Sequence, residues 1–278
     1  MSEVRIVALL ASYNESRFIG QCLEHLHAHG VETYLIDNGS EDDTVAIADS
    51  FRGSGLIGIE QMPRDGVYEW TKILRRKEAL SRELKADWFM HADADELRLP
   101  PPGFDTLHSA FAAADAAGSN AVNFLEFTFV PTRESPDHDH PEFERTLRTY
   151  YPFLPRFPHR LNAWKSAWWR RADLHSRGGH RVSFRGLRMH PDSFHMKHYI
   201  LLSPAHALEK YGGRKFPAEE LARGWHGWRA KADEFTLQLP RAAEMRVTTD
   251  DSDLDASEPL RRHIFDPATL RADTKEQG

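Results

Sequence analysis

The sequence predicts an α/β fold, with a mostly parallel central sheet flanked by helices and a C-terminal helical extension. Two observations predict it. Short apolar runs alternate with segments of helical periodicity through the first hundred residues, and a polar loop follows several of the runs. Strands buried on both faces of a parallel sheet give continuous apolar runs, and helices of this length between them connect parallel neighbours.

The individual elements follow from the same pattern. Apolar runs predict strands at Val4–Leu10, Val31–Ile36, Leu56–Ile59, Trp88–Met90, Ala121–Val130 and Phe194–Leu201. Helical spacing of apolar residues predicts helices at 18–26, Thr44–Phe51, Trp70–Leu84, Phe104–Ala117, Ala205–Tyr211 and Ala218–Phe235. Residues 131–142 are rich in Pro, Asp and His and are predicted to form a mobile loop.

Composition is that of a soluble globular protein. The chain has 36 bases and 42 acids, a net charge of −6, which argues against a nucleic-acid partner. Cys22 is the only cysteine, so an intrachain disulfide is excluded and a reducing compartment is favoured. No apolar run approaches the roughly 18 residues of a membrane span. We expect a cytoplasmic protein and leave open peripheral association with the inner face of the membrane.

Three polar loops directly follow predicted strands. They are Ala11–Glu15, Asp37–Thr44 and Asp93–Glu96. In open α/β sheets, ligands bind at the carboxyl ends of the strands. We therefore expect the three loops to open on the same edge of the sheet and to form one site.

The third loop carries an Asp-x-Asp pattern. Asp93 and Asp95 are two residues apart, a spacing that places both carboxylates on one side of an extended segment. Paired hard oxygen ligands suit Mn²⁺ or Mg²⁺, with diphosphate oxygens completing the shell. The alternative is a solvated acidic turn that caps the next helix.

The second loop contains Asp37 and Asn38. One side chain accepts hydrogen bonds and the other also donates them, so the pair could recognise a pyrimidine edge. The sequence Asn38-Gly39 is equally a strong turn signal. By itself, this loop favours the turn.

Taken together, the three loops resemble those of glycosyltransferase family 2 and its GT-A relatives. Those enzymes carry Tyr-Asn-Glu after the first strand, here Tyr13-Asn14-Glu15. They carry Asp-Asp/Asn-Gly-Ser-x-Asp-x-Thr after the second, here Asp37–Thr44. Many carry Trp-x-x-x-x-Asp-Ala-Asp-Glu after the fourth, here Trp88–Glu96. Order and spacing match over residues 4–100.

The resemblance implies a Rossmann-like GT-A fold, a nucleotide-diphosphate sugar donor, and Mn²⁺ or Mg²⁺. It implies a glycan or lipid-linked acceptor and a place in polysaccharide biosynthesis. The residues it assigns to the donor and its metal are Tyr13, Asn14, Glu15, Asp37, Asn38, Asp93 and Asp95. The family's Arg-Asn on the preceding helix corresponds to Arg76-Lys77, so Arg76 is expected near the donor, with a solvated helix face as the alternative.

The catalytic base is less clearly marked. Inverting family members follow a Gly-Gly loop with an acidic pair that supplies the base. Here Gly178-Gly179 is followed by His180, and no Glu-Asp pair occurs. His180 is therefore one candidate base and Asp173 another, with Asp192 and Glu126 as rivals. The stereochemical outcome stays open.

A third protein ligand for the metal is predicted from the late strand. Several GT-A enzymes supply a histidine there, and His198-Tyr199 resembles a His-Tyr pair found before the last helix in some relatives. His198 is the first choice and His195 the second. His190 also lies in this region, and a shell completed by water is the alternative.

Residues 145–185 hold ten bases and one acid, a local balance of +9, interleaved with aromatic residues. Aromatic faces and arginines suit an anionic glycan or a lipid-diphosphate acceptor. The same pattern suits single-stranded nucleic acid, or simply a core whose bases extend to solvent.

The domain organisation follows from these assignments. We expect a nucleotide-sugar-binding half at 1–100, an acceptor-binding half at 101–204, C-terminal helices at 205–240 and a polar, partly disordered tail at 241–278. Two other functions are considered. A sugar nucleotidyltransferase would carry a Gly-rich basic loop after the first strand, and Ala11–Glu15 has none. A non-catalytic glycan- or RNA-binding module fits poorly with the net acidity and the Asp93/Asp95 pair.

Overall fold

The structure is a computed structural model that describes residues 4–212, 214–227, 229 and 237–265. These residues pack as two compact units. One comprises the chain up to Asp65, Glu69–Leu125 and Pro158–Lys197. The other comprises Gly66–Tyr68, Glu126–Phe157 and the chain from His198. The units do not divide at residues 100 and 204, so the functional halves expected there stay a prediction.

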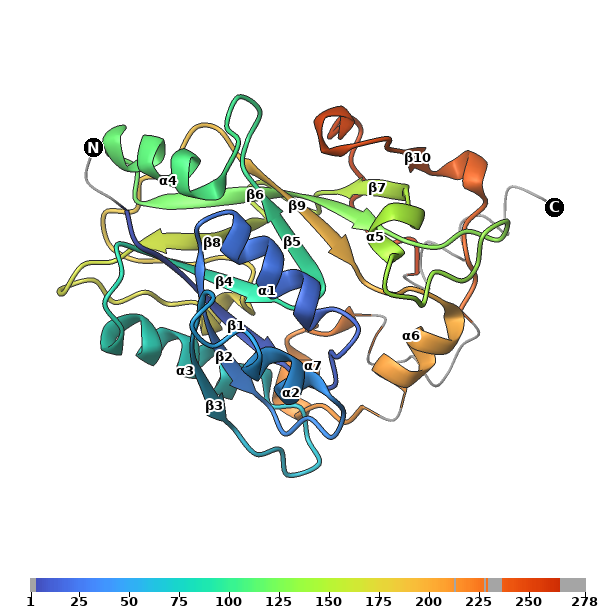
Figure 1. The fold of residues 1–278 in the computed structure, drawn as a ribbon, viewed down its shortest axis with the longest axis horizontal. Helices are drawn as coiled ribbons and strands as arrows, with labels where there is room; N and C mark the ends of the chain where they lie inside the picture. Colours follow the sequence, from blue (N-terminus) through green and yellow to red (C-terminus); the bar gives the residue numbers. More distant parts are fainter. Residues whose placement is uncertain (1–3, 213, 228, 230–236, 266–278) are drawn as a thin grey trace. The chain divides into compact units, whose positions relative to one another are not determined.

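The first unit contains the parallel strands that the apolar runs predict (Figure 1). Its strands are β1 (Ile6–Ser12), β2 (Glu32–Asp37), β3 (Leu56–Gln61), β4 (Trp88–Asp93), β5 (Glu96–Leu99) and β8 (Arg160–Lys165), with the first residues of β6 (Ala121–Phe129) and β9 (Phe194–Tyr199). Strand β1 lies between β2 and β4, β3 pairs with β2, and all three pairs are parallel. Strand β8 is antiparallel to β4 and to β6. The predicted α/β fold class is confirmed.

Helices cover this sheet through stripes of apolar residues. The helices of the first unit are α1 (Ile19–Ala28), α2 (Thr44–Asp49), α3 (Trp70–Glu83) and α4 (Leu107–Ala116). Val7 and Leu9 of β1 share a buried cluster with Leu74 and Leu80 of α3. Full burial of one such side chain contributes about 1.5–3 kcal/mol. Packing of α3 against β1 therefore fixes where this helix presents its remaining side chains.

The second unit is built on the last residues of β6 and β9. Its other elements are α5 (Phe143–Thr146), β7 (Thr149–Phe153), α6 (Pro204–Tyr211), α7 (Ala218–Ala222) and β10 (Arg246–Val247). Strand β7 pairs antiparallel with β6 and with β10. Its core includes Val130, Tyr151, Ile200, Leu201, Tyr211 and Phe265.

Two predictions at the C-terminal end need correction or restriction. The helix predicted over Ala218–Phe235 is too long, because α7 ends at Ala222. Gly224 follows with φ +73°, a left-handed conformation that stops a helix. Residues 228 and 230–235 of the predicted helix and residues 266–278 of the predicted tail lie outside the described residues.

The predicted loop at 131–142 contains no helix or strand, as expected. It is nevertheless attached to its own unit, because Thr132 and His138 are buried and the His138 amide donates to the Leu202 carbonyl at 2.8 Å. Its mobility stays a prediction. Of the helices in the described ranges, none combines the length and apolar character required to cross a membrane.

Candidate active site

Three central strands end side by side. In the parallel register, Ser12 of β1 lies opposite Asp37 of β2, and Ala11 lies opposite Asp93 of β4. The loops after β1, β2 and β4 therefore open on the same edge of the sheet, as the sequence predicts.

Hydrogen bonds join the loops after β1 and β2. The Asn14 amide donates to Ser40 Oγ at 3.0 Å, and Asn14 Oδ1 accepts from the Glu41 amide at 2.8 Å. The Glu15 amide donates to Thr44 Oγ1 at 2.8 Å. Asn14 has φ 53°, a left-handed conformation that asparagine tolerates better than most residues. The Tyr-Asn-Glu pattern thus has a structural task in holding two loops together.

Asp37 organises its own loop. Its side chain is buried, and Oδ2 accepts from the amides of Gly39 at 3.1 Å and Ser40 at 3.0 Å. Ser12 Oγ lies 3.5 Å from Oδ1 and donates to it. Side-chain acceptance from amides two and three residues ahead is the usual aspartate turn. The turn interpretation of this loop therefore describes Asp37 well.

Asn38 and Tyr13 carry the remaining functional groups of these loops. Asn38 Nδ2 donates to the Met62 carbonyl at 2.9 Å, whereas its Oδ1 is buried and has no hydrogen-bond partner among the described residues. The Arg64 guanidinium lies 4.1 Å from the centroid of the Tyr13 ring. A buried acceptor without a partner is costly unless a ligand satisfies it.

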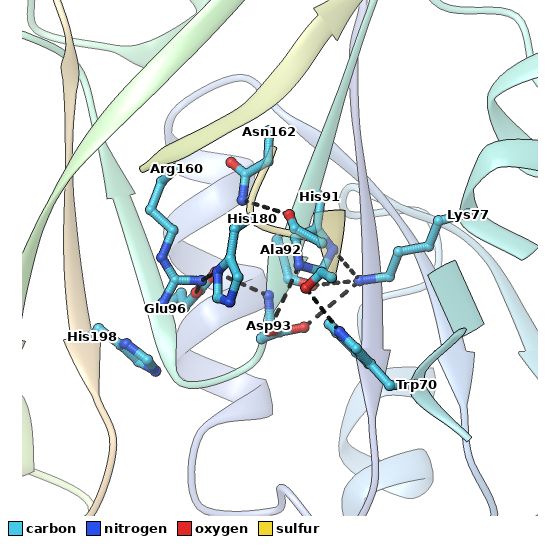
Figure 2. A network of polar contacts seen from close by, with 12 residues as sticks. Trp70, Lys77, His91, Ala92, Asp93, Glu96, Arg160, Asn162, His180 and His198 are labelled. Carbon is cyan, nitrogen blue, oxygen red and sulfur yellow. Dashed lines mark hydrogen bonds and ion pairs between the residues drawn. The ribbon is translucent and has the colours of Figure 1, made fainter. Parts of the chain in front are cut away.

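A buried lysine faces the end of β4. Lys77 of α3 is fully buried, and its Nζ lies 2.7 Å from His91 Nδ1, 3.0 Å from the Ala92 carbonyl and 3.7 Å from Asp93 Oδ1 (Figure 2). Burial lowers the pKa of Lys77 to about 8, although Asp93 opposes this shift. Burial raises the pKa of Asp93, and Lys77 counteracts it. The two charges depend on each other.

His91 lies between this lysine and the Gly-Gly loop. Burial and the Lys77 ammonium lower its pKa well below the usual value, so the ring is neutral. Because Nδ1 accepts from Lys77, the proton is on Nε2, which lies 3.8 Å from Asp93 Oδ2 and has no hydrogen-bond partner among the described residues. Gly179, at φ +84°, allows the close approach: a Cβ there would lie 3.0 Å from Trp70 and 3.3 Å from His91 Nε2.

Glu96 connects the Asp93 backbone to two arginines. Glu96 accepts from Arg98 at 2.5 Å and from the Asp93 amide at 3.3 Å, and Arg160 lies 3.6 Å from its other oxygen. Arg160 also donates to His180 Nδ1 at 3.0 Å. The side chains of Glu96, Arg98 and Arg160 are buried, whereas those of His180 and Asp93 are partly exposed. His180 thereby belongs to the same network as the Asp93–Glu96 loop (Figure 2).

Arg76 and Asp173 lie elsewhere. Arg76 binds Glu60 through two nitrogens, both at 2.7 Å, and Glu83 at 2.8 Å. Lys77, not Arg76, is the residue of this helix that contacts Asp93. Asp173 accepts from the Ser176 amide at 3.0 Å, and in the described ranges it contacts none of the three loops. The roles predicted for Arg76 and Asp173 stay predictions.

The second unit holds His198 and the rival base Glu126. His198 Nδ1 lies 2.6 Å from Glu126 Oε1, and both side chains are buried. Glu126 is thus committed to the histidine ring. Asp192, the other rival base, is exposed and lies 3.9 Å from His190.

Known structures give a distant likeness. Residues 1–349 of S. aureus TarS share 12% identity, covering 70% of this chain and 60% of that one, with a TM-score of 0.42. The same protein in complex with UDP-GlcNAc shares 14% identity, with 70% of this chain and 58% of that one covered, and the TM-score is 0.44. A third structure is glucosyl-3-phosphoglycerate synthase from Mycobacterium tuberculosis in complex with Mn²⁺, UDP and glucosyl-3-phosphoglycerate. It shares 20% identity, with 45% of this chain and 44% of that one covered, and the TM-score is 0.30. The chain thus spans less than two thirds of the TarS chain it resembles.

Sequence families give a direct assignment. A search of curated proteins found no significant match. The family model described as "Glycosyl transferase family 2" matches residues 8–172, more than half of the chain and all three loops. The chain belongs to glycosyl transferase family 2.

Proposed function

We propose that this chain transfers a sugar from a nucleotide-diphosphate sugar to a glycan or lipid-linked acceptor, with a divalent metal ion. One observation carries the proposal. In a family 2 chain, the loops after β1, β2 and β4 meet at one sheet edge, and Asp93 and Asp95 lie at the end of β4 there, Asp93 partly exposed and Asp95 buried. The loops at Tyr13–Glu15 and Asp37–Asn38 would hold the nucleoside, and the aspartates would face the diphosphate.

The side chains around β4 fit a divalent cation. Asp93 is 32% exposed at its side chain, so one carboxylate is accessible. The negative charge of this turn also affects Cys22 of α1. The pKa of its thiol is raised, first by burial and then by the charges of Glu96 and Asp95. Carboxylates crowd this turn, and hard oxygen donors suit Mg²⁺ or Mn²⁺. Held by Asp93 and Asp95, the ion would neutralise charge on the departing nucleoside diphosphate.

Lys77 would keep this carboxylate in place. Its Nζ contacts Asp93 and fixes the His91 tautomer, so His91 presents an N–H toward the same carboxylate. Together the two side chains would hold Asp93 ionised and oriented before the donor binds. Preorganised charge of this kind lowers the reorganisation that accompanies leaving-group departure.

The nucleoside contacts are divided between two side chains. The Asn38 Oδ1 atom is a buried acceptor for which we propose an N–H of the base. Asp37 would act through the loop, because its oxygens already accept from Gly39, Ser40 and Ser12.

The hydrogen bond between Arg160 and His180 bears on whether His180 can act as the catalytic base. A base at this ring requires an available lone pair, and Arg160 already donates to Nδ1, which leaves the proton on Nε2. We therefore favour hydrogen-bond donation from Nε2 to the acceptor over proton removal. His198 as third metal ligand also stays a prediction. Its support is the Glu126 contact, since metal-binding histidines usually place their other nitrogen on a carboxylate.

The proposal is tested by incubating the chain with a panel of nucleotide-diphosphate sugars and measuring released nucleotide with Mn²⁺, with Mg²⁺ and with chelator. Metal-dependent release of nucleoside diphosphate from one donor supports the proposal. Release of pyrophosphate from a nucleoside triphosphate and a sugar phosphate would instead indicate a nucleotidyltransferase. Binding without any release would indicate a non-catalytic module.

A further inference from the structure

The loop after β8 exposes two adjacent tryptophans. Trp168 is 93% exposed and Trp169 is 53% exposed. Tryptophan is largely buried in most folded proteins, so a neighbouring exposed pair is unusual. Arg170 packs its guanidinium 5.2 Å from the Trp169 ring and 4.6 Å from the Phe184 ring.

Arginines gather around these rings. The Arg170–Phe184 contact brings the chain near Arg185 to this loop, and the antiparallel hydrogen bonds between Asp173 and Ser183, at 2.9 and 2.8 Å, align the two segments. Arg188 is close enough that its charge adds to burial in lowering the pKa of Arg170. We name as the Trp–Arg surface the set Trp168, Trp169, Arg170, Arg171, Arg185 and Arg188.

Acidic side chains of the described residues do not pair with the arginines of the Trp–Arg surface. In the described ranges, none of its four arginines forms an ion pair with an acidic side chain. The nearby Lys165 is different, because it pairs with Asp115 at 2.5 Å. The whole chain carries −6, so this positive patch stands against the overall charge.

This surface lies away from the donor loops. Strand β8 runs antiparallel to β4, and Lys165 at its end pairs with Trp88 at the start of β4, whereas Asp93 ends β4. The Ser166 amide donates to the Asp87 carbonyl at 2.7 Å, which holds the loop at that opposite edge. The length of β4, about 3.3 Å per residue, separates the two edges. The sequence pattern of aromatic and basic residues suggests a surface for a sugar or a lipid diphosphate. At this position, however, Trp168 and Trp169 do not lie beside the donor loops.

We propose that the Trp–Arg surface docks this enzyme on a membrane that contains anionic phospholipid. Tryptophan favours the interface between lipid and water, and each arginine is attracted to anionic headgroups. A second copy of the chain is a poor partner, because a symmetric contact would bring like charges together. A glycan or nucleic acid binds best in a concave site, whereas Trp168, at 93% exposure, is not enclosed by other described residues.

The test is flotation of the full chain with vesicles of phosphatidylcholine, alone or mixed with phosphatidylglycerol. Wild type should float with the mixed vesicles and be released by high salt. Arg171→Gln/Arg185→Gln should weaken vesicle binding about 30-fold, because each lost cation weakens it roughly fivefold and the two factors multiply. Trp168→Ser/Trp169→Ser should abolish flotation, while nucleotide binding without vesicles stays unchanged in both variants.

The matched control is Arg75→Gln/Arg262→Gln, which removes the same charge at exposed arginines elsewhere. It should float like wild type. Failure of wild type to float, or an equal loss in the control, would overturn the proposal. The proposal would also be overturned if wild type formed dimers in solution and the tryptophan variant were monomeric. Tight binding of wild type to soluble polyphosphate, without binding to vesicles, would overturn it as well. Because nucleotide release is measured separately, failure of docking is distinguishable from failure of the proposed transfer activity.

Discussion

The loops after β2 and β4 end at the same sheet edge but are held in opposite ways. Asp37 accepts from the amides of Gly39 and Ser40 in its own loop, and Ser12 of β1 adds only a longer contact at 3.5 Å. Asp93 depends on Lys77, which comes from a different element. One aspartate is positioned by local sequence and the other by tertiary structure.

This difference has an energetic consequence. Aspartate turns gain modest hydrogen-bond energy, about 0.5–1.5 kcal/mol for each bond. Buried ion pairs contribute little net stability, yet loss of one partner leaves a buried charge uncompensated. The β4 loop should therefore be the more sensitive of the two to a single substitution far from it in sequence.

The largest expected effect breaks the β4 network. Arg98→Met removes a fully buried partner of Glu96, and we expect the free energy of unfolding in urea to fall by about 3–5 kcal/mol. Arg98→Met/Glu96→Gln should recover part of that loss, because Glu96 is then no longer a buried charge that has lost Arg98; recovery is partial because Arg160 loses its carboxylate partner. A loss below about 1 kcal/mol in the single variant would show that the network is already hydrated.

The next effect concerns the β2 loop. Asp37→Ala removes the acceptor for Gly39 and Ser40, so free nucleoside diphosphate and donor sugar should both bind about 10- to 100-fold more weakly. The two factors should be similar, because the contact that we propose for this loop is with the nucleoside and does not involve the sugar. Calorimetry with both ligands measures them. A change in sugar discrimination alone would place Asp37 elsewhere.

A smaller effect separates the neighbouring bases of α3. Arg76→Gln breaks partly exposed ion pairs with Glu60 and Glu83, so stability should fall by less than about 1 kcal/mol. Metal-dependent nucleotide affinity should not change. Lys77→Met, the matched variant on the buried side of the helix, should lower it. Weaker nucleotide binding by Arg76→Gln would support the role that the family resemblance gives to Arg76.

The smallest effect depends on pH. Burial tends to raise the pKa of Asp42, but hydrogen bonds from Thr44 and Ser16 outweigh it and hold the pKa below the usual 3.8. The carboxylate therefore adds stability above pH 3.8 that is lost as the pH falls through its lowered pKa. Asp42→Asn should cost under about 1 kcal/mol at neutral pH, and the difference should vanish in acid. A constant difference would exclude ionisation as its source.

Sequence patterns predicted the parallel half of the fold well because its strands are apolar on both faces. Strand β8 was missed because Arg160 and Asn162 interrupt its apolar pattern, and both side chains are buried in the polar network. Strand β7, Thr149–Phe153, was missed within a stretch whose aromatic and basic residues suggested a binding surface. These strands depend on partners that a sequence pattern does not reveal.

Lys77 shows what the site analysis missed and which signal could have found it. It stands at helical spacing from Ile73, Leu74 and Leu80, on the stripe that faces the sheet. A charged residue on an apolar stripe requires a buried partner. Arg76 lies beside that stripe, and the family correspondence drew attention to it instead. The identity of the partner, Asp93, follows only from the fold.

The most direct test of the central claim is calorimetry of nucleoside diphosphate binding, with and without Mn²⁺, to wild type and to Asp95→Asn. We expect Mn²⁺ to strengthen binding to wild type, and the variant to bind equally with and without the ion. An unchanged unfolding transition would show that the variant is folded. Equal Mn²⁺ enhancement in wild type and Asp95→Asn would contradict the metal site at the end of β4.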